Sequence, residues 1–282
     1  MPVNTSRFTY QGEDGTEIAG FRWDAPGTPR AIIQLAHGAG EHSLRYLEPL
    51  TPLVEGGYTI YAADHRGHGA TAGSQEKLGD FGPGGAPAAI DDMAVLSRRI
   101  RQENPGVPLA LLGHSMGASF SQVYFTQHHA LIDALVLSGT AANWLPRGER
   151  SLNSGYENPR TDYDWLSRDE AEVDKYIADP LSGIRFTPES RKSFTSLGER
   201  TADAGYLQDV RKDLPIYVFV GDADPVNAGL TRITPLIERF EEAKLSDVTL
   251  KVYPGGRHEM LNETNRDEVV ADLKAWLDRV FT

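Results

Sequence analysis

The chain has 282 residues, of which 40% are hydrophobic and 24% charged, so disordered, collagen-like and coiled-coil architectures are excluded. Twenty-eight basic against 40 acidic residues give a formal net charge of −12, which disfavours nucleic acid and anionic membrane surfaces as partners. There is no cysteine, and disulfide scaffolds, thiolate metal sites and cysteine nucleophiles are therefore excluded.

The first elements along the chain are predicted to form an antiparallel hairpin. Strand-like runs cover residues 7–10 and 17–23, and a turn-rich segment with two glycines separates them. The residues before this hairpin lack the basic start and apolar run of a signal peptide, and no later run approaches the ~18 apolar residues that span a bilayer. We therefore expect a cytoplasmic protein without stable membrane insertion.

From residue 30 onward, short apolar runs alternate with segments of helical spacing. The apolar runs suit strands buried on both faces of a parallel sheet, and they cover residues 31–36, 58–63, 109–112, 134–137 and 216–220. Apolar residues at helical spacing occupy 47–54, 90–100 and 269–280. This alternation predicts an α/β fold with a mostly parallel central sheet and helices on both faces.

The alternation stops between residues 141 and 206, which predicts an inserted cap. We expect a core domain formed by residues 1–140 and 207–282, with the cap over the crevice at the carboxyl ends of the strands. Residues 141–205 contain 12 acidic and 9 basic residues, which makes this cap polar. A helix is predicted to start near its middle, with Ser167 as the capping residue and Glu170 three positions on.

One motif carries the chemistry. Residues 113–117 read Gly-His-Ser-Met-Gly and lie between a predicted strand and a predicted helix, which is the context that the G-x-S-x-G pattern requires. Glycines stand two residues before and two residues after Ser115, because a turn this sharp leaves no room for side chains at those positions. The alternative is a glycine-rich turn in which Ser115 only caps the helix.

A reactive serine needs a histidine base and an acid that orients the base, in the chain order serine, acid, histidine. Of the eight histidines, only His258 lies beyond residue 129, so the choice of base is nearly forced. The acid is expected in the loop after the run at 216–220, where Asp222 and Asp224 compete. Physical reasoning alone leaves both of them open.

The reaction also needs donors for the negative oxygen that forms during attack. The amide of Met116, directly after the serine, is one candidate. The other is the amide of Ala39 in the small-residue loop at 37–40, which follows the first buried strand. Each donor is expected to stabilise the transition state by roughly 3 kcal/mol.

Taken together, these blocks resemble the α/β-hydrolases of the monoacylglycerol lipase and lysophospholipase family. The matching segments are His-Gly-Ala-Gly-Glu-His-Ser at 37–43, Asp-His-Arg-Gly-His-Gly at 64–69, the serine motif, Gly-Asp-Ala-Asp-Pro-Val at 221–226 and Tyr-Pro-Gly-Gly-Arg-His-Glu at 253–259. The resemblance implies that Asp224, before the Pro-Val pair, is the acid of a triad with Ser115 and His258. It also implies that the amides of Ala39 and Met116 form the oxyanion hole.

Other residue groups have simpler explanations. A metal cluster is conceivable among His37, His42, Asp64, His65 and His68, but no pair has the spacing of a zinc-binding helix with a catalytic glutamate. We interpret these residues as hydrogen-bonded supports of the loops around the crevice. Glu41 and Arg45, four residues apart, are expected to form a local ion pair.

The sequence therefore predicts a serine carboxylester hydrolase that works through an acyl-enzyme and needs no metal or organic cofactor. The resemblance suggests monoacylglycerols or lysophospholipids as substrates, whereas the polar cap and the negative net charge favour soluble esters of short or medium chain. Two alternatives stay open: hydrolysis of an amide, peptide or carbon–carbon bond by the same triad, and a non-catalytic protein of this fold that binds small molecules. The oligomeric state is left open.

Overall fold

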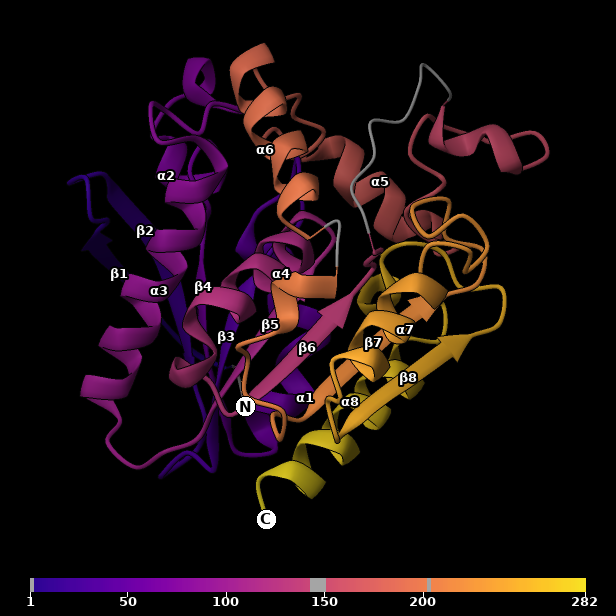
Figure 1. Cartoon of the computed structure of the whole chain (residues 1–282). Coiled ribbons are helices and arrows are strands. Elements are labelled where there is room, and N and C mark those ends of the chain that lie inside the picture. The colour runs from indigo at the N-terminus through magenta and orange to yellow at the C-terminus, as the bar shows by residue number, and fades with distance from the viewer. Residues whose placement is uncertain (1–2, 143–150, 202–203) are drawn as a thin grey trace.

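The computed structural model describes residues 3–142, 151–201 and 204–282, and its centre is a single eight-stranded sheet (Figure 1). The order of the strands across the sheet is β1-β2-β4-β3-β5-β6-β7-β8. The strands are β1 (Asn4–Gln11), β2 (Glu17–Asp24), β3 (Ala31–Ala36), β4 (Tyr58–Ala63), β5 (Leu109–His114), β6 (Ala134–Ser138), β7 (Ile216–Gly221) and β8 (Val248–Tyr253).

The predicted mixture of one hairpin and a parallel sheet is confirmed. Strands β1 and β2 pair antiparallel, β2 pairs antiparallel with β4, and all other neighbours are parallel. Every residue of β3, β4, β5, β6 and β7 is buried, as expected for continuously apolar runs with helices on both sides. Strand β8 lies at the edge and is only half-buried.

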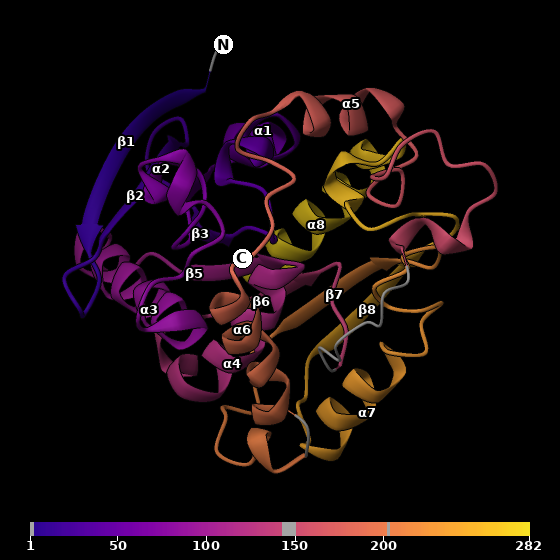
Figure 2. The ribbon, with the colours of Figure 1, turned by 90° about the horizontal axis from the view of Figure 1, so that it is seen from above.

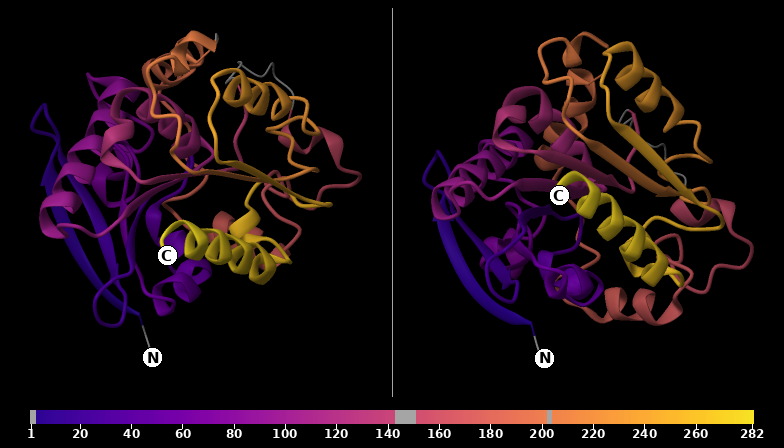
Figure 3. Two further views of the ribbon diagram at one scale, coloured as in Figure 1. Left: turned by 60° about the horizontal axis from the view of Figure 1, so that its bottom comes forward. Right: turned by 90° about the horizontal axis from the view of Figure 1, so that it is seen from below.

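The helices cover both faces of the sheet (Figures 2 and 3). They are α1 (Leu47–Glu55), α2 (Gly69–Ala72), α3 (Gly85–Glu103), α4 (Met116–His128), α5 (Glu170–Ala178), α6 (Pro188–Arg200), α7 (Thr234–Glu242) and α8 (Arg266–Val280). Helices α1 and α8 pack together on one face, and α3, α4 and α7 lie on the other. Over the described ranges, none of these helices is both long and apolar enough to cross a bilayer.

Each face of the sheet has its own hydrophobic core. On one face, Trp23 of β2, Leu53 of α1 and Leu273 of α8 are fully buried together. On the opposite face, Phe120 of α4 and Phe240 of α7 are fully buried. Burying an apolar side chain of this size stabilises the fold by about 1.5–3 kcal/mol. The two cores hold the strands rigidly, and the loops at the strand ends are thereby fixed in position.

The chain between β6 and β7 carries helices α5 and α6 beyond the carboxyl ends of the strands (Figure 1). Helix α6 packs on α3 and α4. The predicted start of α5 was wrong in one detail, because Asp169 and not Ser167 is the capping residue. The Asp169 carboxylate accepts a hydrogen bond from the Ala171 N–H at 3.0 Å, whereas the Ser167 hydroxyl donates to the Asn262 carbonyl at 2.8 Å.

Candidate active site

Ser115 occupies a sharp turn between β5 and α4. Its backbone has φ 52° and ψ −111°, a conformation that side-chain-bearing residues rarely adopt. The neighbouring glycines are required by space. A Cβ atom on Gly113 would lie 2.5 Å from the Gly117 carbonyl oxygen, and one on Gly117 would lie 2.0 Å from the Ala36 carbonyl oxygen. The G-x-S-x-G pattern thus presents the serine side chain at the end of the sheet.

His258 is bonded to one of the two candidate carboxylates. Its Nδ1 lies 2.9 Å from Oδ2 of Asp224, and both side chains are almost completely buried. The second oxygen of Asp224 accepts the Val226 N–H at 2.7 Å. Asp222 points elsewhere, since its carboxylate accepts the Gly255 N–H at 2.6 Å. Because Nδ1 faces a carboxylate, it carries the proton, and Nε2 is left as the basic nitrogen.

His114 stands beside this pair without adding charge. Its ring centroid lies 4.8 Å from that of His258, and its Nδ1 lies 3.1 Å from the Ser138 hydroxyl. Burial, together with the neighbouring His258, lowers the pKa of His114 to about 4. His114 is therefore neutral near pH 7 and does not compete with His258 for a proton.

The loop after β3 presents one unpaired amide toward the site. The Gly38 N–H is bonded to the Glu41 carboxylate at 2.6 Å and the Gly40 N–H to Nε2 of His68 at 3.3 Å. Within the described part of the chain, the intervening Ala39 N–H has no hydrogen-bond partner. The Met116 N–H is also unpartnered there, as is usual for the first residue of a helix. Both predicted donors are thus available to a ligand.

A buried charge network connects this loop to the loop of His258. Arg45 bonds Glu41 at 2.5 Å, as the spacing predicted, and it also bonds both oxygens of Glu259 at 2.7 and 2.8 Å. Burial alone would raise the pKa of Glu41, but the Arg45 charge lowers it to about 2. The role of Glu259 was not predicted from the sequence, because its partner Arg45 lies more than 200 residues earlier in the chain and the pairing leaves no local signal.

The histidines considered as metal ligands hold the loops together. His37 Nε2 accepts the His65 N–H at 3.0 Å, and its Nδ1 lies 2.8 Å from the Gly38 carbonyl. Burial lowers the pKa of His37 and brings that of His68 to about 3, so both rings are neutral. His42 is paired with Asp179, the residue directly after α5, at 2.6 Å. Within the described ranges, no cluster of acidic and histidine side chains has the geometry to hold a metal ion.

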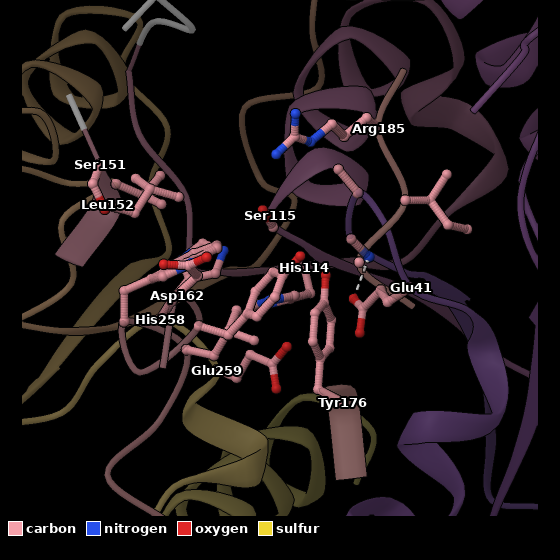
Figure 4. A pocket seen from close by; sticks show the side chains of 18 residues that line it. Glu41, His114, Ser115, Ser151, Leu152, Asp162, Tyr176, Arg185, His258 and Glu259 are labelled. Atoms are coloured by element: carbon pink, nitrogen blue, oxygen red, sulfur yellow. Dashed lines mark hydrogen bonds between the residues drawn. The ribbon is translucent and has the colours of Figure 1, made fainter. Parts of the chain in front are cut away.

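A cavity of about 390 Å³ brings several of the predicted residues together. Ser115, His258 and Ala39 line it, and Figure 4 shows Ser115 and His258 among the side chains around it. Asp224 lies behind His258, and Met116 directly follows Ser115. The remaining lining residues are partly apolar and partly charged, and they include Leu152, Trp165, Leu166, Ile184, Val226, Glu41, Asp162, Arg185 and Glu259. This combination of nucleophile, base, acid and free amides suits acyl transfer.

Comparison with known proteins identifies the family. A family model described as serine aminopeptidase, S33, matches residues 27–265. The chain belongs to this family of hydrolases. It is similar to a monoacylglycerol lipase of Mycolicibacterium smegmatis, with 30% identity over 96% of both chains. It is also similar to a monoglyceride lipase of Mus musculus, with 30% identity over 94% of this chain and 88% of the relative.

The solved structures agree with this family. A highly thermostable carboxyl esterase from Bacillus coagulans, in complex with glycerol, matches all of this chain with a TM-score of 0.90 and 27% identity, and all of its own chain is covered. The expected α/β-hydrolase fold and the resemblance to monoacylglycerol lipases are thus confirmed. The chain is a serine hydrolase.

Proposed function

We propose that the chain hydrolyses carboxylic esters through an acyl-enzyme formed on Ser115. One observation carries the proposal: the strained turn at Ser115 and the buried His258–Asp224 pair open into one cavity. The names of the similar monoacylglycerol lipases and of the carboxyl esterase support ester substrates.

The proposed first half-reaction forms the acyl-enzyme. Nε2 of His258 takes the proton of the Ser115 hydroxyl while its oxygen attacks the ester carbonyl, and Asp224 holds the imidazole and stabilises its positive charge. The amides of Ala39 and Met116 donate to the resulting oxyanion, and each such donor contributes about 3 kcal/mol to the transition state. His258 then gives the proton to the leaving alcohol as the ester C–O bond breaks.

The proposed second half-reaction uses water in place of the serine. His258 deprotonates a water molecule, whose oxygen attacks the acyl carbonyl, and the proton then returns to Ser115 as the acid product leaves. Apart from this water molecule, every group that takes part in the scheme, other than the ester itself, belongs to the chain.

We infer that the preferred substrates are monoacylglycerol-type or lysophospholipid-type esters whose acyl chains are short or medium in length. The cavity of about 390 Å³ is near the lower end of the ~300–1,000 Å³ that is usual for ligand sites. The polar composition of residues 141–206, which we propose to be a separate cap over the core, argues in the same direction. A series of acyl esters of increasing length tests this inference, and highest activity on emulsified long-chain lipid would refute it.

The variant Ser115→Ala tests the reaction itself. We expect its turnover of a short chromogenic ester to fall by at least ~10⁴-fold. Ser196→Ala, which removes an exposed hydroxyl from α6, is the matched control and is expected to keep normal activity. Near-normal turnover by Ser115→Ala would end the proposal.

The family match to serine aminopeptidases supports amides and peptides as a second candidate class. Parallel assays with an ester and an amide of the same acyl group separate the two classes. We expect the ester to be preferred, and preference for the amide would reverse the assignment.

We further propose a cytoplasmic location and a small-molecule substrate without a nucleic-acid partner. The net charge of −12 supports the absence of a nucleic-acid partner, because it repels the closely spaced phosphates of a nucleic-acid backbone. Cell fractionation tests the location, and recovery of the chain with membranes after a high-salt wash would contradict it.

A further inference from the structure

A short part of the cap segment is fastened to the core beside the active site. It runs between α5 and α6 and includes Arg185. On one side of Arg185, the Gly183 N–H donates to the Gly40 carbonyl at 2.8 Å, and on the other, the Thr187 N–H donates to the Gly79 carbonyl at 3.1 Å. The position of the Arg185 backbone is therefore set by the core.

The neighbouring aromatic ring strengthens this attachment. Phe186 packs against Phe81 and His68, with ring centroids 5.0 and 5.8 Å apart. Since Phe186 is turned into this cluster, the side chain of the residue before it is presented to the cavity. Arg185 lines the cavity, and Figure 4 shows its guanidinium group extending over the space above Ser115.

The Arg185 guanidinium is exposed and, within the described part of the chain, has no hydrogen bond or ion pair. Other arginines near the site are engaged. Arg45 bonds two glutamates, Arg168 bonds Glu263 at 2.9 Å, and Arg257 donates to backbone carbonyls. In a chain with 40 acidic and 28 basic residues, an unpaired cation over the candidate nucleophile is notable and suggests an external anionic partner.

The acidic groups of the cavity do not supply that partner. Glu41 and Glu259 are bonded to Arg45 at its base. Asp162 is exposed on the side of the cavity opposite Arg185, and no ion pair joins the two among the described residues. A bound molecule is therefore attracted by Arg185 and repelled by Asp162 wherever it carries negative charge, and this fixes its orientation.

We propose that Arg185 is a specificity-determining residue that binds an anionic group, a carboxylate or a phosphate, carried by the ester substrate. This inference rests on the proposed ester hydrolysis at Ser115 and narrows its substrate class to charged small esters. The planar guanidinium offers paired donors that match two oxygens of a carboxylate or phosphate. Because Arg185 is exposed, water and salt weaken the plain charge attraction, and the selectivity depends mainly on these paired hydrogen bonds.

Two matched pairs of esters test the proposal and separate the two anionic groups. The first pair is 4-nitrophenyl hydrogen glutarate and the neutral 4-nitrophenyl pentanoate. The second is butanoyl glycerol 3-phosphate and neutral butanoyl glycerol. For each pair, the ratio of kcat/KM for the anionic ester to that for the neutral ester is measured in the wild type, in Arg185→Gln and in Arg185→Lys.

We expect Arg185→Gln to lower this ratio about 3- to 10-fold in at least one pair, because a charge-assisted hydrogen bond at an exposed site is lost. The pair affected identifies the anion as carboxylate or phosphate. Arg185→Lys keeps the positive charge but loses the paired donors of the guanidinium. Its ratio is expected to lie between those of the wild type and Arg185→Gln. Arg191→Gln removes an exposed arginine from α6 that does not line the cavity, and its ratio is expected to stay unchanged.

A ratio that stays within about twofold of the wild type in both pairs would overturn the role of Arg185. That outcome differs from failure of the proposed function, in which the wild type would hydrolyse neither the neutral nor the anionic esters. As a second variant, Asp162→Asn removes the opposing charge and is expected to raise the ratio. A fall of the ratio in Asp162→Asn would contradict the proposed orientation.

Discussion

Replacing Arg45 by methionine tests the buried charge network at the base of the site. The substitution keeps much of the side-chain volume but removes the charge-assisted bonds to Glu41 and Glu259. Both carboxylates are nearly inaccessible, with side-chain exposures of 3% and 4%. They would remain buried without a cation, and the cost of breaking such a buried network by removing one partner is about 3–5 kcal/mol.

This loss is large enough to measure by thermal unfolding. At roughly 2–4 °C per kcal/mol for a chain of this size class, the expected fall in Tm is about 6–20 °C. Activity is expected to fall as well, because Glu41 accepts the Gly38 N–H next to the Ala39 amide, and Glu259 directly follows His258. The fall is expected in kcat more than in KM, since the network positions catalytic groups.

The matched control is Arg98→Met. Arg98 pairs with Glu13 at 3.2 Å, but their side chains are 45% and 60% exposed. Exposed pairs contribute about 0–1 kcal/mol, so little change in Tm is expected. If the free energies of unfolding of Arg45→Met and Arg98→Met differ by less than about 1 kcal/mol, the buried network does not stabilise the fold as proposed.

Three further predictions concern the triad, the turn and the acid stability. Asp224→Asn is expected to lower kcat by ~10⁴-fold through the wrong imidazole tautomer, whereas Asp222→Asn should cost less than ~10-fold, and equal losses would contradict the assignment. Gly117→Ala brings a Cβ atom to 2.0 Å from a carbonyl oxygen of β3 and is expected to lower Tm and kcat. Gly155→Ala is the control, because a Cβ atom there meets nothing within 4 Å. An unchanged Tm in Gly117→Ala would refute this prediction. Because the folded pKa of Glu41 is about 2 and its ordinary value about 4.3, its stabilisation is complete above that ordinary value and is lost as the pH falls toward 2. Chemical unfolding at several pH values should therefore show a steeper acid loss in the wild type than in Glu41→Gln, and equal slopes would contradict it.

The sheet was predictable from the sequence because its strands are buried on both faces. The runs at 31–36 and 58–63 begin and end as predicted, since buried alanine or tyrosine residues stand at both ends of each run. The start of α5 was less predictable. Ser167 and Asp169 both suit a helix start, and the tertiary hydrogen bond from Ser167 to Asn262 decided between them.

The site was predictable where the chemistry demands a fixed residue type at a sharp turn. Small residues around Ser115 and a single late histidine identified Ser115 and His258 as candidates without any structure. The choice between Asp222 and Asp224 needed either the family resemblance or the coordinates, because two residues in one loop differ only in where their side chains point. Arg185 could not be predicted, since its significance is the absence of a local partner in the described structure.

The most direct measurement is the covalent labelling of the chain by a fluorophosphonate, with the modified residue located by mass spectrometry. We expect one adduct, on Ser115, which forms far more slowly in the folded His258→Ala variant and not at all after heat denaturation. Labelling of a different residue, or no labelling of the natively folded wild type, would contradict the existence of an activated serine at this turn.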